Sequence, residues 1–319
     1  MINHCEEESV QKLFLIWNEW MNTMQSLVRI TGVVMLAAVF LGGCINSDKL
    51  SKGGVEMAQT RVTDNPSGKT YPGKFIWHDL MTPDLTSAGK FYEELFGWRI
   101  EYEGLYAVVH NGDKPIAGIL QVEPADGSDT QGVWLPSVSV ADVDTTAGLV
   151  KVNGGTILKG PLDMGQRGRA VLISDPHRAD LVLLSAKGGD PADTEAAIGD
   201  WLWDEIWTDD PDGTEDFYAA VLGYDEMLSA DEYDVFMHQG KWRAGIRHVR
   251  DDREYKAWVP VIRVADPVAI TKRVTDLGGT VWIAPDEAPS DGDNALIADT
   301  TGALLLIQRW PSQTSEGEL

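Results

Sequence analysis

The sequence predicts an α+β protein of two tandem domains, assembled from four copies of a unit with one strand, one helix and three further strands (βαβββ). The first observation is an internal repeat, in which residues 75–98 match residues 201–224 at a constant offset of 126. A second pair of segments, 133–161 and 257–285, matches at an offset of 124. Identical pairs in the first match are Trp77/Trp203, Thr82/Thr208, Asp84/Asp210, Phe91/Phe217, Tyr92/Tyr218 and Gly97/Gly223. The chain is therefore a tandem duplication.

A shorter repeat divides each half again: an Asp follows a short apolar segment, and a Gly follows that Asp after 12 or 13 residues. The four pairs are Asp84–Gly97, Asp142–Gly154, Asp210–Gly223 and Asp266–Gly278. An Asp at a helix start accepts hydrogen bonds from free backbone N–H groups. A Gly just past the last turn takes the left-handed conformation that ends a helix. The spacing therefore predicts four helices of about three turns each.

After the helices the sequence predicts strands that pair as hairpins. The first hairpin turns at Asn111-Gly112, a pair of residues that favours a tight turn between strands. The hairpin segments are 106–112 with 116–122, 233–240 with 242–249, 170–185 and 295–309. Together with the strand before each helix, they complete the four βαβββ units.

The N-terminal segment predicts a targeting signal. Residues 30–43 form an apolar run of 14, which is shorter than the about 20 residues of a membrane-spanning helix and typical of a secretory signal. The run ends in Leu41-Gly42-Gly43-Cys44, which resembles a bacterial lipobox and implies a lipid on Cys44 after cleavage. An uncleaved signal anchor is the alternative. Acidic residues near the start of the chain are unusual in such a signal, so translation from a later start codon is a further alternative.

Boundaries and composition complete the outline. The predicted segments are 1–43 as signal peptide, 44–73 as lipidated Cys and flexible tether, 74–187 as first domain, 188–199 as linker, 200–310 as second domain and 311–319 as tail. Each domain is expected to fold independently, since each has its own paired units. The formal charge of −24 repels phosphates and excludes a nucleic-acid partner. With two cysteines, Cys5 and Cys44, a disulfide framework or cysteine-rich zinc site is excluded.

A resemblance to a known family rests on the first strand and helix of each half. Their pattern W-H/D-D/E-L/I-x-T-x-D, followed by Phe-Tyr and Gly-Trp/Tyr, is similar to a two-domain glyoxalase-like branch of the vicinal oxygen chelate superfamily. That superfamily includes glyoxalase I, extradiol dioxygenases and bleomycin-resistance proteins. The resemblance covers about residues 74–310 and implies tandem domains whose curled mixed sheets each enclose a cavity. It also implies that metal enzymes of the superfamily hold His and Glu ligands on the cavity wall.

The positions where the resemblance places metal ligands carry no carboxylate or imidazole. They are Trp77, Leu135, Val182 and the region Gly118–Leu120 in the first half, and Trp203, Val259, Leu306 and the region Gly245–Arg247 in the second. His78 lies one residue along the strand and is expected on the opposite face. A divalent ion needs several oxygen, nitrogen or sulfur donors. The sequence therefore predicts no metal and no cofactor, and ion-dependent lyase or dioxygenase chemistry is not expected.

Alternation along the first strand of each half places a carboxylate between apolar residues on one face. The candidate cavity-wall residues are Trp77, Asp79, Trp134, Trp203, Glu205 and Trp258. A carboxylate flanked by indoles suits a cationic or flat aromatic ligand. The alternative is that Asp79 and Glu205 are structural carboxylates bonded to backbone amides, with the indoles as core. No triad or nucleophile motif occurs, so no catalytic residue is predicted, and a binding role is favoured over an enzyme.

Three hypotheses on function remain. The first is an envelope-anchored lipoprotein with two metal-free glyoxalase-like domains that bind a small, partly aromatic or cationic molecule. The second is a glyoxalase-like lyase or oxygenase with a non-standard metal site, or with acid/base chemistry through Asp79 or Glu205. The third is a structural or assembly lipoprotein with packed domains. The anchor at Cys44 predicts a membrane partner and a place in the cell envelope, at the outer membrane facing the periplasm in a Gram-negative source.

Overall fold

A computed structural model describes residues 57, 60–122, 131–230, 233–249, 256–286 and 292–310 of the chain. The predicted signal peptide, Cys44 and the tail from residue 311 lie outside these ranges. Within the described part, no helix has the length and apolar character that crossing a membrane requires.

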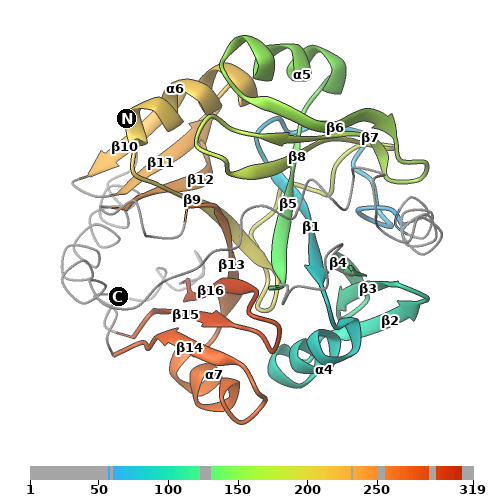
Figure 1. Ribbon diagram of the computed structural model, residues 1–319, viewed down its shortest axis with the longest axis vertical. Coiled ribbons are helices and arrows are strands. Elements are labelled where there is room, and N and C mark those ends of the chain that lie inside the picture. Colours follow the sequence, from blue (N-terminus) through green and yellow to red (C-terminus); the bar gives the residue numbers. More distant parts are fainter. Residues whose placement is uncertain are drawn as a thin grey trace, which may run out of the picture.

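The described residues form two eight-stranded mixed sheets, one from each half of the chain (Figure 1). The strands of the first sheet are β1 Phe75–Thr82, β2 Arg99–Glu103, β3 Tyr106–Asn111, β4 Lys114–Gln121, β5 Val133–Ser139, β6 Thr156–Asp163, β7 Gly168–Ser174 and β8 Asp180–Ala186. Those of the second are β9 Trp201–Thr208, β10 Glu226–Ala230, β11 Tyr233–His238, β12 Lys241–His248, β13 Trp258–Val264, β14 Thr280–Ile283, β15 Asn294–Ala298 and β16 Leu304–Arg309.

Both sheets have the same topology. The first runs β2-β3-β4-β1-β5-β8-β7-β6, and the second repeats that order with β10-β11-β12-β9-β13-β16-β15-β14. In the first unit β1 pairs with β4 in parallel, and it pairs with β5 of the next unit in antiparallel register. The α+β class and the tandem arrangement of βαβββ units are thus confirmed.

The four predicted helices are α4 Leu85–Phe96, α5 Val143–Val152, α6 Pro211–Leu222 and α7 Pro267–Val274. Each predicted Asp caps its helix, because its side chain accepts a hydrogen bond from the backbone N–H three residues on. Gly97 and Gly223 end α4 and α6 at φ values of 73° and 74°. The C-cap residues of the other two helices are Asn153 and Thr275, shortly before their predicted glycines.

One face of each sheet, here called the helix face, packs against the other half of the chain. Figure 1 shows α5 beside α6 at one end of this boundary and α4 beside α7 at the other. One core joins α4 to residues of β13, β15 and β16, and a second joins α5 to α6 and β12. The expectation that each half folds independently is therefore not supported, since both cores are shared.

The repeated Gly-Gly-Thr motif explains how the halves approach so closely. A Cβ atom added at Gly279 would lie 2.6 Å from the ring of Phe91, which belongs to α4 of the other half. At Gly155 it would lie 3.0 Å from the ring of Phe217 on α6. Real Cβ atoms rarely approach another heavy atom so closely, so each glycine admits a phenylalanine of the other half.

Two matching hydrogen-bond chains cross the boundary between the halves. In the first, Trp134 Nε1 donates to Tyr92 Oη at 2.9 Å, and Tyr92 donates to Asp299 Oδ2 at 3.0 Å. In the second, Trp258 donates to Tyr218 at 2.9 Å and Tyr218 to Asp175 at 3.0 Å.

The positions of Trp134 and Trp258 correct their assignment to the cavity wall. Trp134 pairs across the sheet with Leu80 of the helix face, and Trp258 with Ile206. Their neighbours Leu135 and Val259, opposite Asp79 and Glu205, lie on the other face of each sheet. A shift of one residue along a strand separates the two faces.

Part of the predicted tether packs on the first domain. Residues 60–73 pair with the chain around the linker: Ser67 N donates to Asp190 O at 2.9 Å, and Asp190 N donates to Lys69 O at 2.8 Å. Val62 is buried in a cluster with Trp77. This stretch therefore belongs to the folded structure.

Candidate functional site

The free face of the first sheet, opposite its helix face, carries Trp77, Asp79 and Met81 of β1, as alternation predicts. Asp79 is buried, and its Oδ1 accepts hydrogen bonds from Trp77 Nε1 at 3.1 Å and from Tyr106 Oη at 2.8 Å. Burial raises the pKa of Tyr106, so its hydroxyl keeps the proton that it donates to Asp79 at neutral pH.

An arginine that sequence reasoning missed completes this cluster. Arg167, from the turn before β7, donates from Nη1 to Asp79 Oδ2 at 2.6 Å and from Nη2 to Tyr106 Oη at 2.6 Å. Its guanidinium carbon lies 4.9 Å from the Trp77 ring centroid. The side chains of Arg167 and Asp79 are only 4% and 6% exposed, so they form a buried ion pair.

Gly118 of β4 gives the cluster its space. A Cβ atom at this position would lie 1.8 Å from Tyr106 Oη and 2.4 Å from Asp79 Oδ1. Any larger residue would break the tyrosine–carboxylate hydrogen bond.

The second sheet has a corresponding cluster around Glu205. Tyr233 Oη donates to Glu205 Oε1 at 3.0 Å, and Arg247 donates to Oε2 from Nε at 3.1 Å and from Nη2 at 2.7 Å. Arg247 lies 4.8 Å over the ring of Trp207, whose Nε1 donates to Glu205 at 3.3 Å. A Cβ atom on Gly245 would lie 2.0 Å from Tyr233 Oη. Predicted candidates Asp79 and Glu205 thus lie in equivalent, fully bonded clusters.

Next to the Asp79–Arg167 pair lies a cavity of about 30 Å³, whose lining includes Met57, Leu135 and Val182. A water molecule needs about 10–15 Å³ of such space, so the cavity has room for about two waters. An organic ligand does not fit there in the described structure.

The free face does not fit the divalent ion of the metal enzymes that the resemblance names. Leu135 and Val182, two of the predicted ligand positions, line this cavity but offer only aliphatic groups. The one carboxylate beside them, Asp79, is already paired with a guanidinium whose charge repels a divalent ion. Among the residues that the structure describes, no group of three or more His, Cys, Asp or Glu side chains could hold a metal ion.

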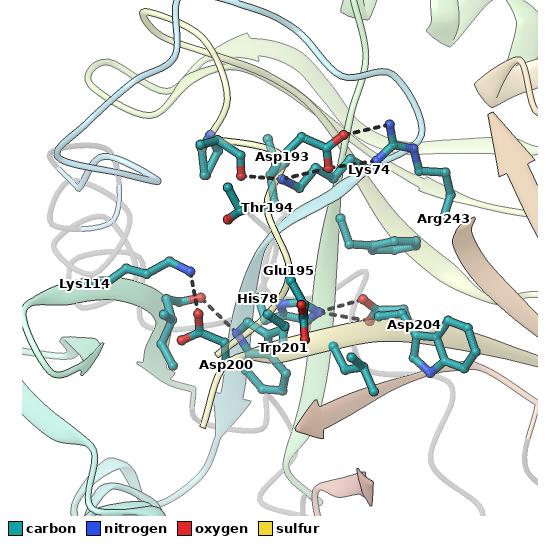
Figure 2. A pocket seen from close by; sticks show the side chains of 18 of the residues that line it. Lys74, His78, Lys114, Asp193, Thr194, Glu195, Asp200, Trp201, Asp204 and Arg243 are labelled. Atoms are coloured by element: carbon teal, nitrogen blue, oxygen red, sulfur yellow. Dashed lines mark hydrogen bonds and ion pairs between the residues drawn. The ribbon is translucent and has the colours of Figure 1, made fainter. Parts of the chain in front are cut away.

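A larger pocket of about 280 Å³ lies between the two halves, under linker residues 191–196 (Figure 2). We call it the interdomain pocket. Its walls come from the starts of β1, β4, β9 and β12, and they include four indoles: Trp201, Trp203, Trp242 and Trp310. Trp242 and Trp203 stack with centroids 6.0 Å apart. The pocket thus combines flat aromatic walls with charged side chains.

His78 and Asp204 face each other inside this pocket (Figure 2). His78 Nε2 lies 2.9 and 3.0 Å from the two carboxylate oxygens of Asp204, and the two side chains are 1% and 0% exposed. The His78 ring lies 4.1 Å from that of Trp201. Burial raises the pKa of Asp204, and the neighbouring His78 opposes that shift. As predicted, His78 is on the face opposite Trp77.

The linker contributes an acidic residue at the mouth of the pocket. Asp193 accepts hydrogen bonds from Arg243 at 3.1 and 3.2 Å, and it lies 3.4 Å from Lys74 (Figure 2). It also accepts a hydrogen bond from Lys241 at 2.8 Å. Burial acts to raise the pKa of Asp193, but hydrogen bonds from Arg243 and Lys241 hold it well below its usual range. Burial lowers the pKa of Lys74, and Asp193 opposes that shift.

Three buried side-chain nitrogens on the lining residues have no hydrogen-bond partner within the described ranges: His78 Nδ1, Trp203 Nε1 and Arg243 Nε. Buried polar groups in folded proteins are normally hydrogen-bonded, so such orphans gathered at one pocket need an explanation. These nitrogens are closed to solvent in the described structure, so acceptor oxygens of a bound molecule would satisfy the N–H groups of Trp203 and Arg243 after a shift of these side chains.

Comparison with known proteins shows similarity to one superfamily and to several of its relatives. Residues 74–183 match the family described as the Glyoxalase/Bleomycin resistance protein/Dioxygenase superfamily. The chain is 28% identical over 241 residues to a putative glyoxylase, CFP32, of Mycobacterium bovis, covering 72% of this chain and 92% of that protein. It is 27% identical over 255 residues to the anthracycline biosynthesis protein DnrV of Streptomyces peucetius, covering 73% and 91%.

Solved structures share the fold at low sequence identity. An Mn(II)-bound glyoxalase from Novosphingobium aromaticivorans aligns with a TM-score of 0.52 at 12% identity, over 75% of this chain and 83% of that one. A mutant homoprotocatechuate 2,3-dioxygenase from Brevibacterium fuscum aligns with a TM-score of 0.55 at 11% identity, over 79% and 76%. These likenesses concern the fold.

Proposed function

We propose that this chain, in which residues 74–183 match the Glyoxalase/Bleomycin resistance protein/Dioxygenase superfamily, is a metal-independent binding protein that holds one small organic molecule in the interdomain pocket. The observation that carries the proposal is the gathering of unpartnered buried nitrogens and indole rings around that pocket. Its volume of about 280 Å³ is slightly below the range of about 300–1,000 Å³ for sites that hold drug-sized ligands. A compound of one or two rings matches this size.

The lining indicates the chemistry of the ligand. Indole faces favour a flat ring, and the N–H groups of Trp203 and Arg243 favour acceptor oxygens on it. The pocket lining carries three cationic side chains and four carboxylates, so a negative charge on the ligand is not required: the cations are Lys74, Lys114 and Arg243, and the carboxylates are Asp193, Glu195, Asp200 and Asp204. We therefore expect a neutral aromatic compound with carbonyl or hydroxyl oxygens.

This proposal moves the site away from the two free faces that the sequence suggested. In the first half, the cavity beside Asp79 has room for about two waters only. In both halves the predicted carboxylates are hydrogen-bonded to an arginine and a tyrosine of their own half. Their contacts support a structural role for Asp79 and Glu205, and one ligand site per chain between the halves.

The buried His78–Asp204 pair favours an acid/base enzyme as the second candidate function. In the tautomer whose Nε2 donates to Asp204, a neutral imidazole has an unprotonated Nδ1 that can act as a base. A carboxylate that fixes the tautomer in this way is a common arrangement around a catalytic histidine. Turnover of a bound compound that His78→Gln abolishes while binding persists would favour this candidate over binding alone.

We also propose that the protein is anchored in the cell envelope through a lipid on Cys44. The support is the Leu41-Gly42-Gly43-Cys44 ending of the apolar segment. In a Gram-negative source, the absence of an Asp at position 45, which is Ile45, favours the outer membrane facing the periplasm. Stable anchoring needs more than one acyl chain, which lipoprotein processing provides.

A ligand screen tests the binding proposal directly. Oxygen-bearing one- and two-ring aromatic compounds are screened by thermal shift on the mature chain carrying Cys44→Ser, and hits are titrated by calorimetry. Trp242→Ala removes a half-buried pocket wall and is expected to weaken binding about tenfold or more. Trp282→Ala, which removes a half-buried indole outside the pocket lining, is the matched control and should bind normally. Hits whose affinity is the same for both variants would place the site elsewhere.

A further inference from the structure

We infer that in each half an arginine guanidinium has replaced the divalent ion of metal-binding relatives as the counter-charge of the free face. In the first half, Arg167 shares its surroundings with three of the four predicted ligand positions. It stacks over Trp77 at 4.9 Å and lines one cavity together with Leu135 and Val182. The fourth region contains Gly118, whose missing side chain leaves space for both partners of Arg167, Asp79 and Tyr106.

The second half reaches the same arrangement from a different part of the chain. Its arginine, Arg247, stands on strand β12 inside the fourth predicted ligand region itself. The repeat equivalent of Arg247 in the first half is Leu120, whereas Arg167 comes from the turn before β7. The carboxylate and the tyrosine, by contrast, occupy equivalent positions in the two halves.

This difference in origin shows what the free face requires. A carboxylate buried in each sheet is strongly unfavourable without a positive partner and full hydrogen bonding. An arginine meets both needs, because its guanidinium stays charged and offers several N–H donors in a fixed plane. The two halves share the carboxylate but supply the cation from different positions. This difference indicates that a positive charge is required beside the buried carboxylate.

The same geometry makes arginine and metal mutually exclusive. Arg167 Nη1 lies 2.6 Å from Asp79 Oδ2, the carboxylate oxygen that an ion would have to use. A divalent ion there would lie within a few ångströms of a fixed positive charge in a poorly solvated site. The free face of each half is therefore expected to be closed to ions and insensitive to chelators.

The test titrates the mature Cys44→Ser chain with Mn²⁺, Zn²⁺ and Mg²⁺, with bound Mn²⁺ followed by electron paramagnetic resonance and stability by thermal melts. In the parent chain, neither EDTA nor any of these ions should change Tm. Arg167→Ala is expected to lower Tm by roughly 10 °C and to recover part of that loss on addition of Mn²⁺. Asp79→Asn/Arg167→Ala, which also removes the carboxylate, should regain stability without ions and bind none.

The second half supplies an independent copy of this experiment through Arg247→Ala and Glu205→Gln/Arg247→Ala. Arg169→Ala is the matched control, since Arg169 forms an exposed ion pair with Asp144 and its loss should alter neither Tm nor ion binding. Stoichiometric Mn²⁺ on the parent chain that Asp79→Asn abolishes would overturn the inference. So would arginine variants in both halves that gain nothing from any ion. If Arg167→Ala does not fold, the titration of the parent chain and the Arg247 variants still test the inference. None of these outcomes depends on the interdomain ligand.

Discussion

The strongest test of how the halves hold together is to remove one hydroxyl from each hydrogen-bond chain that crosses their boundary. Tyr92→Phe leaves Trp134 Nε1 without its acceptor and Asp299 Oδ2 without its donor, and all three side chains are buried. A buried donor or acceptor left without a partner costs about 1–3 kcal/mol. With two such groups, we expect the free energy of unfolding to fall by about 2–6 kcal/mol.

Tyr218→Phe removes the equivalent hydroxyl between Trp258 and Asp175 and should have an effect of the same size. The two chains share no residue, so the double variant should lose the sum within about 0.5 kcal/mol. The assay is urea unfolding followed by tryptophan fluorescence. Tyr102→Phe, at a 46% exposed tyrosine, is the control and should stay within about 0.5 kcal/mol of the parent chain. If both buried tyrosines behave like Tyr102, these chains do not hold the halves together.

Three further outcomes are expected. Halves separated within 188–200 should not unfold cooperatively alone, because both helix-face cores are shared, and circular dichroism melts of each fragment test this. Burial raises the pKa of Asp180 to about 6, so the folded state binds its proton more tightly than the unfolded state does. The free energy of unfolding therefore falls as the pH rises from about 4 to 6. Asp180→Asn should remove that fall. It should raise the free energy of unfolding by on the order of 2–3 kcal/mol at neutral pH and leave it unchanged at low pH. Cys44→Ser should leave an uncleaved precursor that takes up no labelled palmitate.

Much of the fold was predictable because its signals are local. The Asp residues before the four helices are read directly from their spacing, and each caps its helix as expected. Alternation on β1 assigns Trp77 and Asp79 to one face and His78 to the other, and the structure confirms this assignment. These features depend on a few consecutive residues, so no distant contact is needed to recognise them.

The misassigned indoles, Trp134 and Trp258, show where local patterns fail. Their strands β5 and β13 are buried on both faces almost throughout, so no exposed polar residue marks which face is which. Arg167 was missed for another reason: it lies in a turn 88 residues from Asp79, and a turn arginine ordinarily faces solvent. The repeat gave no hint of Arg247 either, because its equivalent is Leu120.

The His78–Asp204 pair is a product of the duplication. The two residues are separated by 126 positions, which is the offset of the repeat, so they are equivalent residues that meet at the axis relating the halves. Two identical chains paired about a two-fold axis place the same residue on both sides of it, so a histidine there would meet a histidine and an aspartate an aspartate. Duplication within one chain removes that restriction, because each copy can change separately. The asymmetric interdomain pocket, with an imidazole from one half and a carboxylate from the other, is thus an arrangement that a symmetric dimer of one domain could not form.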